Sequence, residues 1–170
     1  MIRIALLVYA LFAATDVSAQ RQDASPPAGV RAVMKRFKAT EITQGKDRAA
    51  LFTDDALVFN AWDGRYEGRH AVDSLWNSLA QSGTFASSKI EEKATTYRKL
   101  SGSLWLVDYL ELLTGQRGKS GREFPPRNTH MTFIIARQKN DEWRIIYFRA
   151  ADAREFVNRN RARDSTNVLR

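Results

Sequence analysis

The chain contains no cysteine, so disulfide bonds, thiolate catalysis and cysteine-ligated zinc are all excluded. It has only two histidines, His70 and His130, which lie far apart in the sequence and match no metal-ligand spacing. The sequence has no glycine-rich phosphate loop, no Gly-x-Ser-x-Gly nucleophile elbow and no zinc-binding helix motif. We therefore expect neither a metal site nor a cofactor, and covalent catalysis has no support in the sequence.

The chain also lacks an apolar run long enough to span a bilayer. Residues 1–19 instead match a secretory signal, in which Arg3 forms the basic region, residues 4–14 the apolar stretch and residues 17–19 a small-residue cleavage site. No cysteine follows the apolar stretch, so a bacterial lipid anchor on cysteine is excluded. We predict cleavage after Ala19 and a periplasmic or secreted protein without a stable membrane anchor.

Acidic residues are the minority, with 19 Asp and Glu against 27 Lys and Arg, which gives a formal net charge of +8. Loss of the signal would remove one base, Arg3, and one acid, Asp16, and so leave the charge unchanged. The basic residues are spread along the chain, and no aromatic-basic motif typical of nucleic-acid binding is visible. We interpret the charge as a solvated basic surface and expect no nucleic-acid partner.

What the sequence does contain suffices for one globular domain, since 44% of its 170 residues are hydrophobic. We divide the chain into a signal (1–19), a flexible leader (20–27), a folded domain (28–151) and a basic C-terminal helix or tail (152–170). Asp152 and Glu155 form a capping-box pattern at the start of that last segment.

Helical periodicity dominates the first part of the domain. Val30, Val33, Met34 and Phe37 fall on one face of a helix predicted over residues 28–43. A short helix near Asp47, a turn at residues 54–55, a strand over 56–62, a turn at 63–64, a short edge over 65–67 and a helix over 69–81 follow.

Alternation dominates the second part and predicts strands over residues 89–98, 104–114, 127–137 and 143–151. Helices grouped early and strands grouped late indicate an α+β domain. We expect its helices to pack on one face of a curved antiparallel sheet.

The strand over 104–114 carries an unusual residue, Asp108, on a face that is otherwise all leucine. A buried carboxylate needs a partner or a raised pKa. If the following loop closes symmetrically, that face meets Arg127 on the next strand. Asp108 and Arg127 would then be an acid/base pair or substrate clamp at a pocket. The alternatives are a structural ion pair, or a register that places Asp108 in solvent.

The order and spacing of these segments resemble the nuclear transport factor 2-like superfamily, in its SnoaL-like branch. The resemblance covers roughly residues 28–151 and rests on the first helix, on LFTDDALVFN (51–60), DGRYEGRHAV (63–72), TG (114–115), RNTHMTF (127–133) and WRIIYF (143–148). It implies a cone-shaped, cystatin-like fold in which a bent sheet wraps around N-terminal helices and a pocket opens at one end. It also implies homodimers that pair through the outer face of the sheet.

The chain departs from the ketosteroid isomerases of that superfamily at all three of their catalytic roles. Asn60 stands where the resemblance implies a general-base aspartate, and an amide cannot take up a proton near neutral pH. Phe37 and Thr129 stand where it implies the two oxyanion-hole donors, a tyrosine and an aspartic acid. Isomerase chemistry of that kind is therefore rejected.

Three functions remain as hypotheses, because the scaffold alone decides no activity. The first is an exported domain that binds a small, partly apolar molecule in its cone. The second is a cofactor-independent isomerase, dehydratase or cyclase in which Asp108 is the base and Arg127 stabilises negative charge. The third is a dimeric interaction module with a vestigial pocket. The predicted pocket residues are Asn60, Trp62, Tyr66, Asp108, Arg127, Thr129, Met131 and Phe148, and the predicted dimer face is Trp143, Ile145 and Tyr147.

Overall fold

The computed structural model describes residues 25–40, 45–118 and 120–152 of the 170-residue chain. The elements are α1 (Ala28–Ala39), α2 (Gly45–Ala49), β1 (Phe52–Phe59), β2 (Arg65–Glu67), α3 (Gly68–Gln81), β3 (Lys89–Lys99), β4 (Leu104–Thr114), β5 (Arg127–Arg137) and β6 (Trp143–Asp152). No helix within these ranges has the length and apolar character needed to cross a bilayer. The predicted signal, leader and C-terminal helix lie outside the described residues, apart from residues 25–27 and Asp152, which ends β6.

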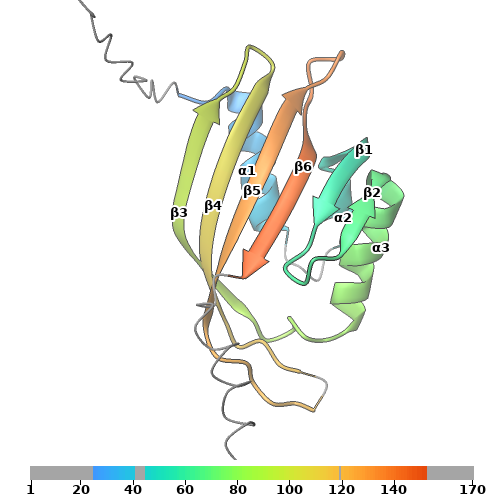
Figure 1. Cartoon of the computed structure of the whole chain (residues 1–170), viewed down its shortest axis with the longest axis vertical. Helices are drawn as coiled ribbons and strands as arrows, with labels where there is room; N and C mark the ends of the chain where they lie inside the picture. Colours follow the sequence, from blue (N-terminus) through green and yellow to red (C-terminus); the bar gives the residue numbers. More distant parts are fainter. Residues whose placement is uncertain (1–24, 41–44, 119, 153–170) are drawn as a thin grey trace, which may run out of the picture.

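The six strands form one curved, open sheet in the order β2-β1-β6-β5-β4-β3 (Figure 1). Strands β3 to β6 form the predicted antiparallel meander. The sheet is mixed, however, because β1 lies beside β6 and runs parallel to it. The α+β class is confirmed, and the expectation of a wholly antiparallel sheet is wrong at this one pairing.

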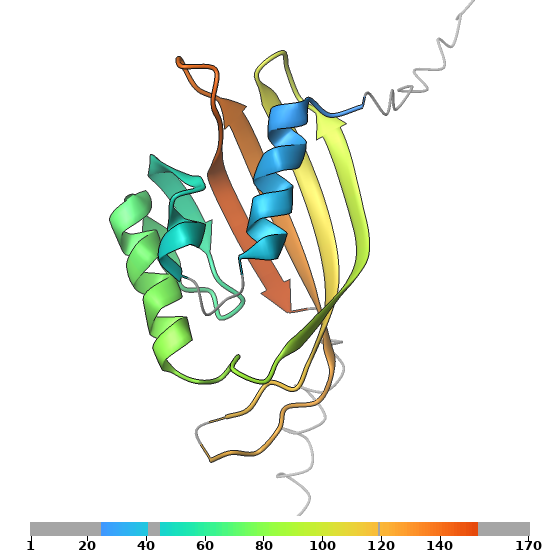
Figure 2. The same ribbon diagram turned by 180° about the vertical axis from the view of Figure 1, so that it is seen from behind.

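All three helices lie on the concave side of the sheet. Figure 2 shows α1 crossing the meander, while α2 and α3 lie beside β1 and β2. The predicted apolar stripe of α1 is buried: Val30, Val33, Met34 and Phe37 all belong to the core. Phe148 of β6 lies at the centre of an aromatic cluster and contacts Phe37, Phe52, Trp76 and Phe133 at ring-centroid distances of 5.1–6.3 Å.

Strand β1 begins four residues earlier than predicted, at Phe52 rather than residue 56. The expected turn at Asp54 and Asp55 is absent. Both residues lie exposed within the strand, at a point where the pairing of β1 with β6 shifts register. Such a bulge accommodates two consecutive polar residues without ending the strand.

The predicted turn after β1 is confirmed, and Asn60 holds it together. Its side-chain oxygen accepts hydrogen bonds from the backbone N–H of Trp62 (3.0 Å) and of Gly64 (2.8 Å). Asp63 adopts a left-handed φ of 61°, a conformation that Asp tolerates better than most residues. The turn fixes Trp62 at the end of the sheet.

The pairing of β4 with β5 decides which side chains face the helices. Glu111 lies opposite Thr129 and Leu113 lies opposite Arg127, so the odd-numbered residues of both strands share the concave face. The sequence predicts that the even-numbered residues of β4 share a face with Arg127. The observed register differs by one residue, so the odd-numbered residues share that face instead. In a strand, a slip of one residue moves every side chain to the other face.

A second irregularity, in β6, affects the predicted dimer face. The register with β5 shifts between Ile134 and Ile135, so that Ile135 pairs with Ile145 and Ile134 with Tyr147. Ile145 is consequently in the core and Trp143 packs against it, whereas Tyr147 lies on the convex face beside Phe59. The assignment of Trp143 and Ile145 to a dimer face is therefore wrong.

Candidate functional site

A cavity of about 60 Å³ lies between the helices and the concave face, where β4 ends and β5 begins. Its lining is mainly apolar and comes from both layers of the fold: Phe37, Ala61, Leu75, Trp76, Leu79, Phe85, Leu113, Met131, Phe148 and Ala150. The polar lining residues are Arg48, Asn60, Glu111, Arg127 and Thr129. Trp62 also lines the cavity but is 53% exposed, which places it at the mouth.

Six of the eight predicted pocket residues line this cavity, although they come from distant parts of the chain: Asn60, Trp62, Arg127, Thr129, Met131 and Phe148. Tyr66 does not line it. Its hydroxyl accepts a hydrogen bond from the Asn60 amide at 3.4 Å and so supports the turn.

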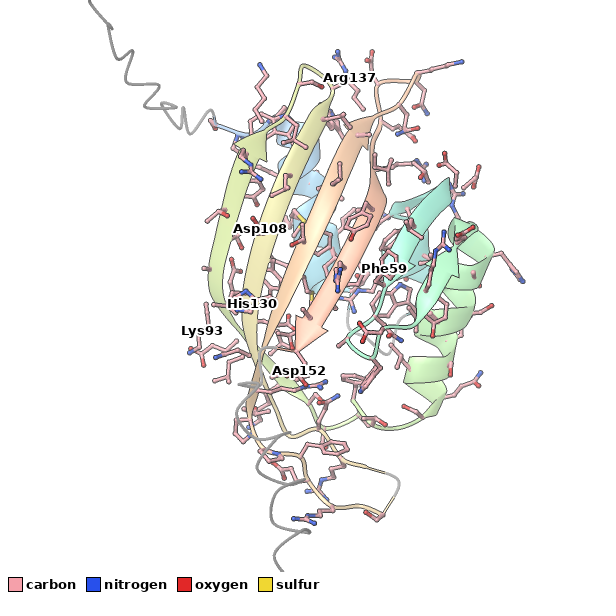
Figure 3. All side chains as sticks on the ribbon, viewed as in Figure 1. Phe59, Lys93, Asp108, His130, Arg137 and Asp152 are labelled. Atoms are coloured by element: carbon pink, nitrogen blue, oxygen red, sulfur yellow. The ribbon has the colours of Figure 1, made fainter. Side chains whose placement is uncertain are left out.

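Asp108 lies on the other side of the sheet. Figure 3 shows Asp108 and His130 on the convex face, away from α1. Asp108 is exposed and accepts a hydrogen bond from the Thr132 hydroxyl at 2.8 Å. It cannot serve as a base for a molecule in the cavity, so the predicted pairing of Asp108 with Arg127 is wrong.

The buried carboxyl in the cavity is Glu111, three residues farther along β4, which the sequence analysis missed. It is 4% exposed. Burial raises the pKa of Glu111, while Arg48, hydrogen bonding with Tyr109 and the charge of Arg127 act in the opposite direction. A carboxyl with a raised pKa beside an apolar cavity can exchange a proton with a bound molecule.

Arg48, on the short helix α2, is the second missed residue. Its guanidinium is buried against two rings, 3.9 Å from the Phe37 centroid and 4.6 Å from the Trp76 centroid. One of its terminal nitrogens donates a hydrogen bond to the Phe37 carbonyl at 3.2 Å. Burial lowers the pKa of Arg48 to about 10, with Glu111 and Tyr109 acting against the shift, so the side chain stays charged near neutral pH.

Arg127 forms an ion pair with Asp152 at 3.1 Å, and both side chains are almost fully buried. The guanidinium carbon also lies 5.8 Å from the Trp62 ring centroid, which connects the ion pair to the mouth of the cavity. The partner of Arg127 is thus a carboxylate at the end of β6 rather than Asp108.

Unpaired polar atoms concentrate at this cavity. Seven buried side-chain nitrogens and oxygens of the described residues have no hydrogen-bond partner, and four of them belong to lining residues. These four are Arg48 Nε, Trp76 Nε1, Arg127 Nε and Thr129 Oγ1. Buried donors without partners are rare in folded proteins, so a group of them at one cavity calls for an explanation, such as a bound molecule that accepts their hydrogen bonds. In the part of the chain that the structure describes, no cluster of acidic and histidine side chains could hold a metal ion.

Neither a family model nor a curated protein matches the sequence. Solved structures do match the fold. An uncharacterised protein with a cystatin-like fold from Caulobacter vibrioides superimposes with a TM-score of 0.67 at 16% identity, over 78% of this chain and 92% of that one. An NTF2-like protein of unknown function from Pseudomonas putida KT2440 gives 0.59 at 19% identity, over 72% and 82%. A ketosteroid isomerase-like protein from Erwinia carotovora atroseptica gives 0.56 at 15% identity, over 75% and 92%.

Proposed function

On the cystatin-like, nuclear transport factor 2-like fold that the chain adopts, we propose that the protein binds a small, partly apolar molecule in the cavity beside Trp62. The observation that carries the proposal is the composition of the cavity wall. A mainly apolar lining includes a few polar groups, among them Glu111, Arg127 and Thr129. Ligand sites commonly combine a mainly apolar surface with a small number of converging polar groups.

The size of the cavity limits the ligand. About 60 Å³ is far below the roughly 300–1,000 Å³ of sites for drug-sized molecules. It is also below the roughly 150 Å³ of an engineered cavity that binds benzene. A steroid or polyketide does not fit, so the proposed ligand has only a few heavy atoms. We further propose that binding takes place outside the cytoplasm, since residues 1–19 carry the features of an export signal.

A co-purifying ligand is the first expected result. Protein purified from its own host should carry a small molecule that native mass spectrometry detects and that denaturation releases. Replacing Ala150, which lines the cavity, by leucine should reduce the bound fraction at least about tenfold, because the added side chain occupies the cavity.

The matched control is Ala151→Leu, the same change at the neighbouring, exposed position of β6. It should leave the bound fraction unchanged. Wild-type protein without any bound molecule, or equal loading of the two variants, would contradict the proposal.

We also propose that the chain forms a homodimer through the convex face of the sheet. That face carries apolar, half-buried side chains from β1, β4, β5 and β6: Phe59, Leu106, Leu110, Ile134 and Tyr147. Three neighbouring strands contribute one cross-strand row of this face, which consists of Asp108, Thr132 and Arg149, with Thr132 in the middle. A two-fold axis above Thr132, running along β5, would set Asp108 of each copy over Arg149 of the other. The face is therefore self-complementary in charge as well as apolar.

Sedimentation velocity tests this proposal. We expect a dimer for the wild type and a monomer for Leu110→Glu, because a buried, unpaired carboxylate opposes association. The control is Leu100→Glu, at a leucine that is exposed at the β3–β4 turn and should leave the dimer intact. A monomeric wild type would overturn the proposal.

A further inference from the structure

All four unpaired atoms at the cavity can donate a hydrogen bond. Arg48 Nε, Arg127 Nε and Trp76 Nε1 can only donate hydrogen bonds, and the Thr129 hydroxyl can donate one. Each of these side chains is at least nine-tenths buried and lines the same cavity. A neutral apolar molecule would leave all four donors without a partner. The complementary group is one that only accepts, such as an ionised carboxylate.

The charges around the cavity lead to the same conclusion. Arg48 and Arg127 contribute two positive charges, and Asp152 neutralises Arg127. If Glu111 is ionised, it balances Arg48. If Glu111 is protonated, the site has one positive charge in excess, which a single anionic ligand would neutralise.

We propose that the ligand is a short-chain monocarboxylate, whose carboxylate accepts hydrogen bonds from Arg48, Arg127, Trp76 and Thr129 and whose alkyl end contacts Leu79, Phe85 and Met131. This inference rests on the proposed function and names its ligand class. The cavity volume of about 60 Å³ restricts the alkyl part to about one or two carbons. Inorganic phosphate and sulfate are less suitable, because they have no apolar part to fill the rest of the wall.

Binding of the anion is coupled to a proton that Glu111 takes up from solvent. Two ionised carboxylates cannot share one buried cavity without a strong penalty. The groups that act on Glu111 are Arg48 on α2, Tyr109 on its own strand and Arg127 on β5, and burial raises the pKa of Glu111 in spite of them. Glu111 therefore accepts the proton more readily than a carboxyl in water does.

The sign of the pH dependence follows from this linkage. Below the pKa of Glu111 in the free protein the carboxyl is already protonated, and the affinity for the anion is constant. Above that pKa each binding event must take up one proton, so the affinity falls about tenfold per pH unit.

The experiment compares acetate with acetamide, a neutral molecule of nearly the same shape and small enough for the cavity. The intrinsic fluorescence of Trp62 and Trp76, which line the cavity, reports binding, and isothermal titration calorimetry reports the affinity and the proton uptake. We expect acetate to bind at least about tenfold more tightly than acetamide at the pH where its binding is tightest, because its carboxylate makes charge-assisted hydrogen bonds. Sulfate at the same ionic strength should not compete.

Two variants assign the roles. Thr129→Val removes the hydroxyl at constant shape and should weaken acetate binding about tenfold. Its control is Thr53→Val, since Thr53 is also buried with an unpaired hydroxyl but does not line the cavity. Glu111→Gln mimics the protonated carboxyl, so it should retain acetate binding and lose the pH dependence.

The outcomes separate this inference from the proposed function. Equal affinity for acetate and acetamide would overturn the carboxylate inference and leave the proposal of a small-molecule site standing. Binding of acetate that is independent of pH in the wild type, or equally weakened by Thr53→Val, would also overturn the inference. A lack of binding by both molecules at millimolar concentration, with no co-purifying ligand, would overturn both.

Discussion

Phe148→Ala is expected to lower the free energy of unfolding by about 3–5 kcal/mol, the range for truncating a large buried aromatic side chain. Phe148 is 1% exposed and contacts four other aromatic rings, which come from α1, β1, α3 and β5. No single neighbour can move into the space without losing contacts of its own. The loss therefore includes a cavity contribution besides the transfer of the ring.

Urea denaturation followed by circular dichroism measures this effect. The control is Phe124→Ala, the same change at a side chain that is 43% exposed in the loop between β4 and β5. It should cost less than about 1 kcal/mol. Similar losses for the two variants would show that the aromatic cluster is not the centre of the core.

Arg127→Leu is expected to destabilise the fold by about 3–5 kcal/mol, because it leaves the carboxylate of Asp152 buried after its ion-pair partner is removed. The side chains of the pair are only 8% and 12% exposed. Thermal unfolding of the single variant and of the double variant Arg127→Leu/Asp152→Leu tests the reason. The double variant should recover a large part of the loss, because neither charge then remains buried.

An exposed ion pair provides the comparison. Arg65 and Glu67 pair on the edge strand β2, where each side chain is 62% exposed. Arg65→Leu should cost less than about 1 kcal/mol, because water screens the charges in both states. If the double variant at Arg127 and Asp152 were no more stable than the single one, the loss would come from packing of the arginine rather than from the charge.

Local patterns in the sequence sufficed to predict most of the secondary structure and the fold class. The stripe on α1 predicts a buried helix face, and alternation predicts β4 and β5 with their observed bounds. The turn at Asp63 and Gly64 depends on residues that tolerate a left-handed backbone. In these segments the residues nearby in the sequence set the structure, so a single sequence is informative.

Predicting the candidate site required the register between β4 and β5, which local patterns in the sequence do not contain. Both faces of β4 are apolar, and each carries one carboxyl, Asp108 on the convex face and Glu111 on the concave one. Only the register between β4 and β5 decides which of them is buried. The 12-residue loop over 115–126 does not fix that register. The alternation therefore predicted a carboxyl at the pocket, but it indicated Asp108 instead of Glu111.

Two other errors have related causes. The bulge near Ile146 places Ile145 and Tyr147 on opposite faces of β6, although regular alternation would place them on the same face. No glycine or proline in β6 indicates the bulge in the sequence. Arg48 lies in a short polar segment that is typical of an exposed helix. Its burial depends on Phe37 and Trp76, which come from two other helices.

The parallel pairing of β1 with β6 has a consequence for how the chain folds during synthesis. β1 ends at Phe59, yet β6, one of its two neighbours in the sheet, begins at Trp143, so this pair forms only after the intervening strands have left the ribosome. Until then α1, α2 and α3 have no complete sheet to pack against. We expect the nascent chain to expose Phe37, Phe52 and Trp76 until late in translation, a stage at which a holdase chaperone would protect it from aggregation.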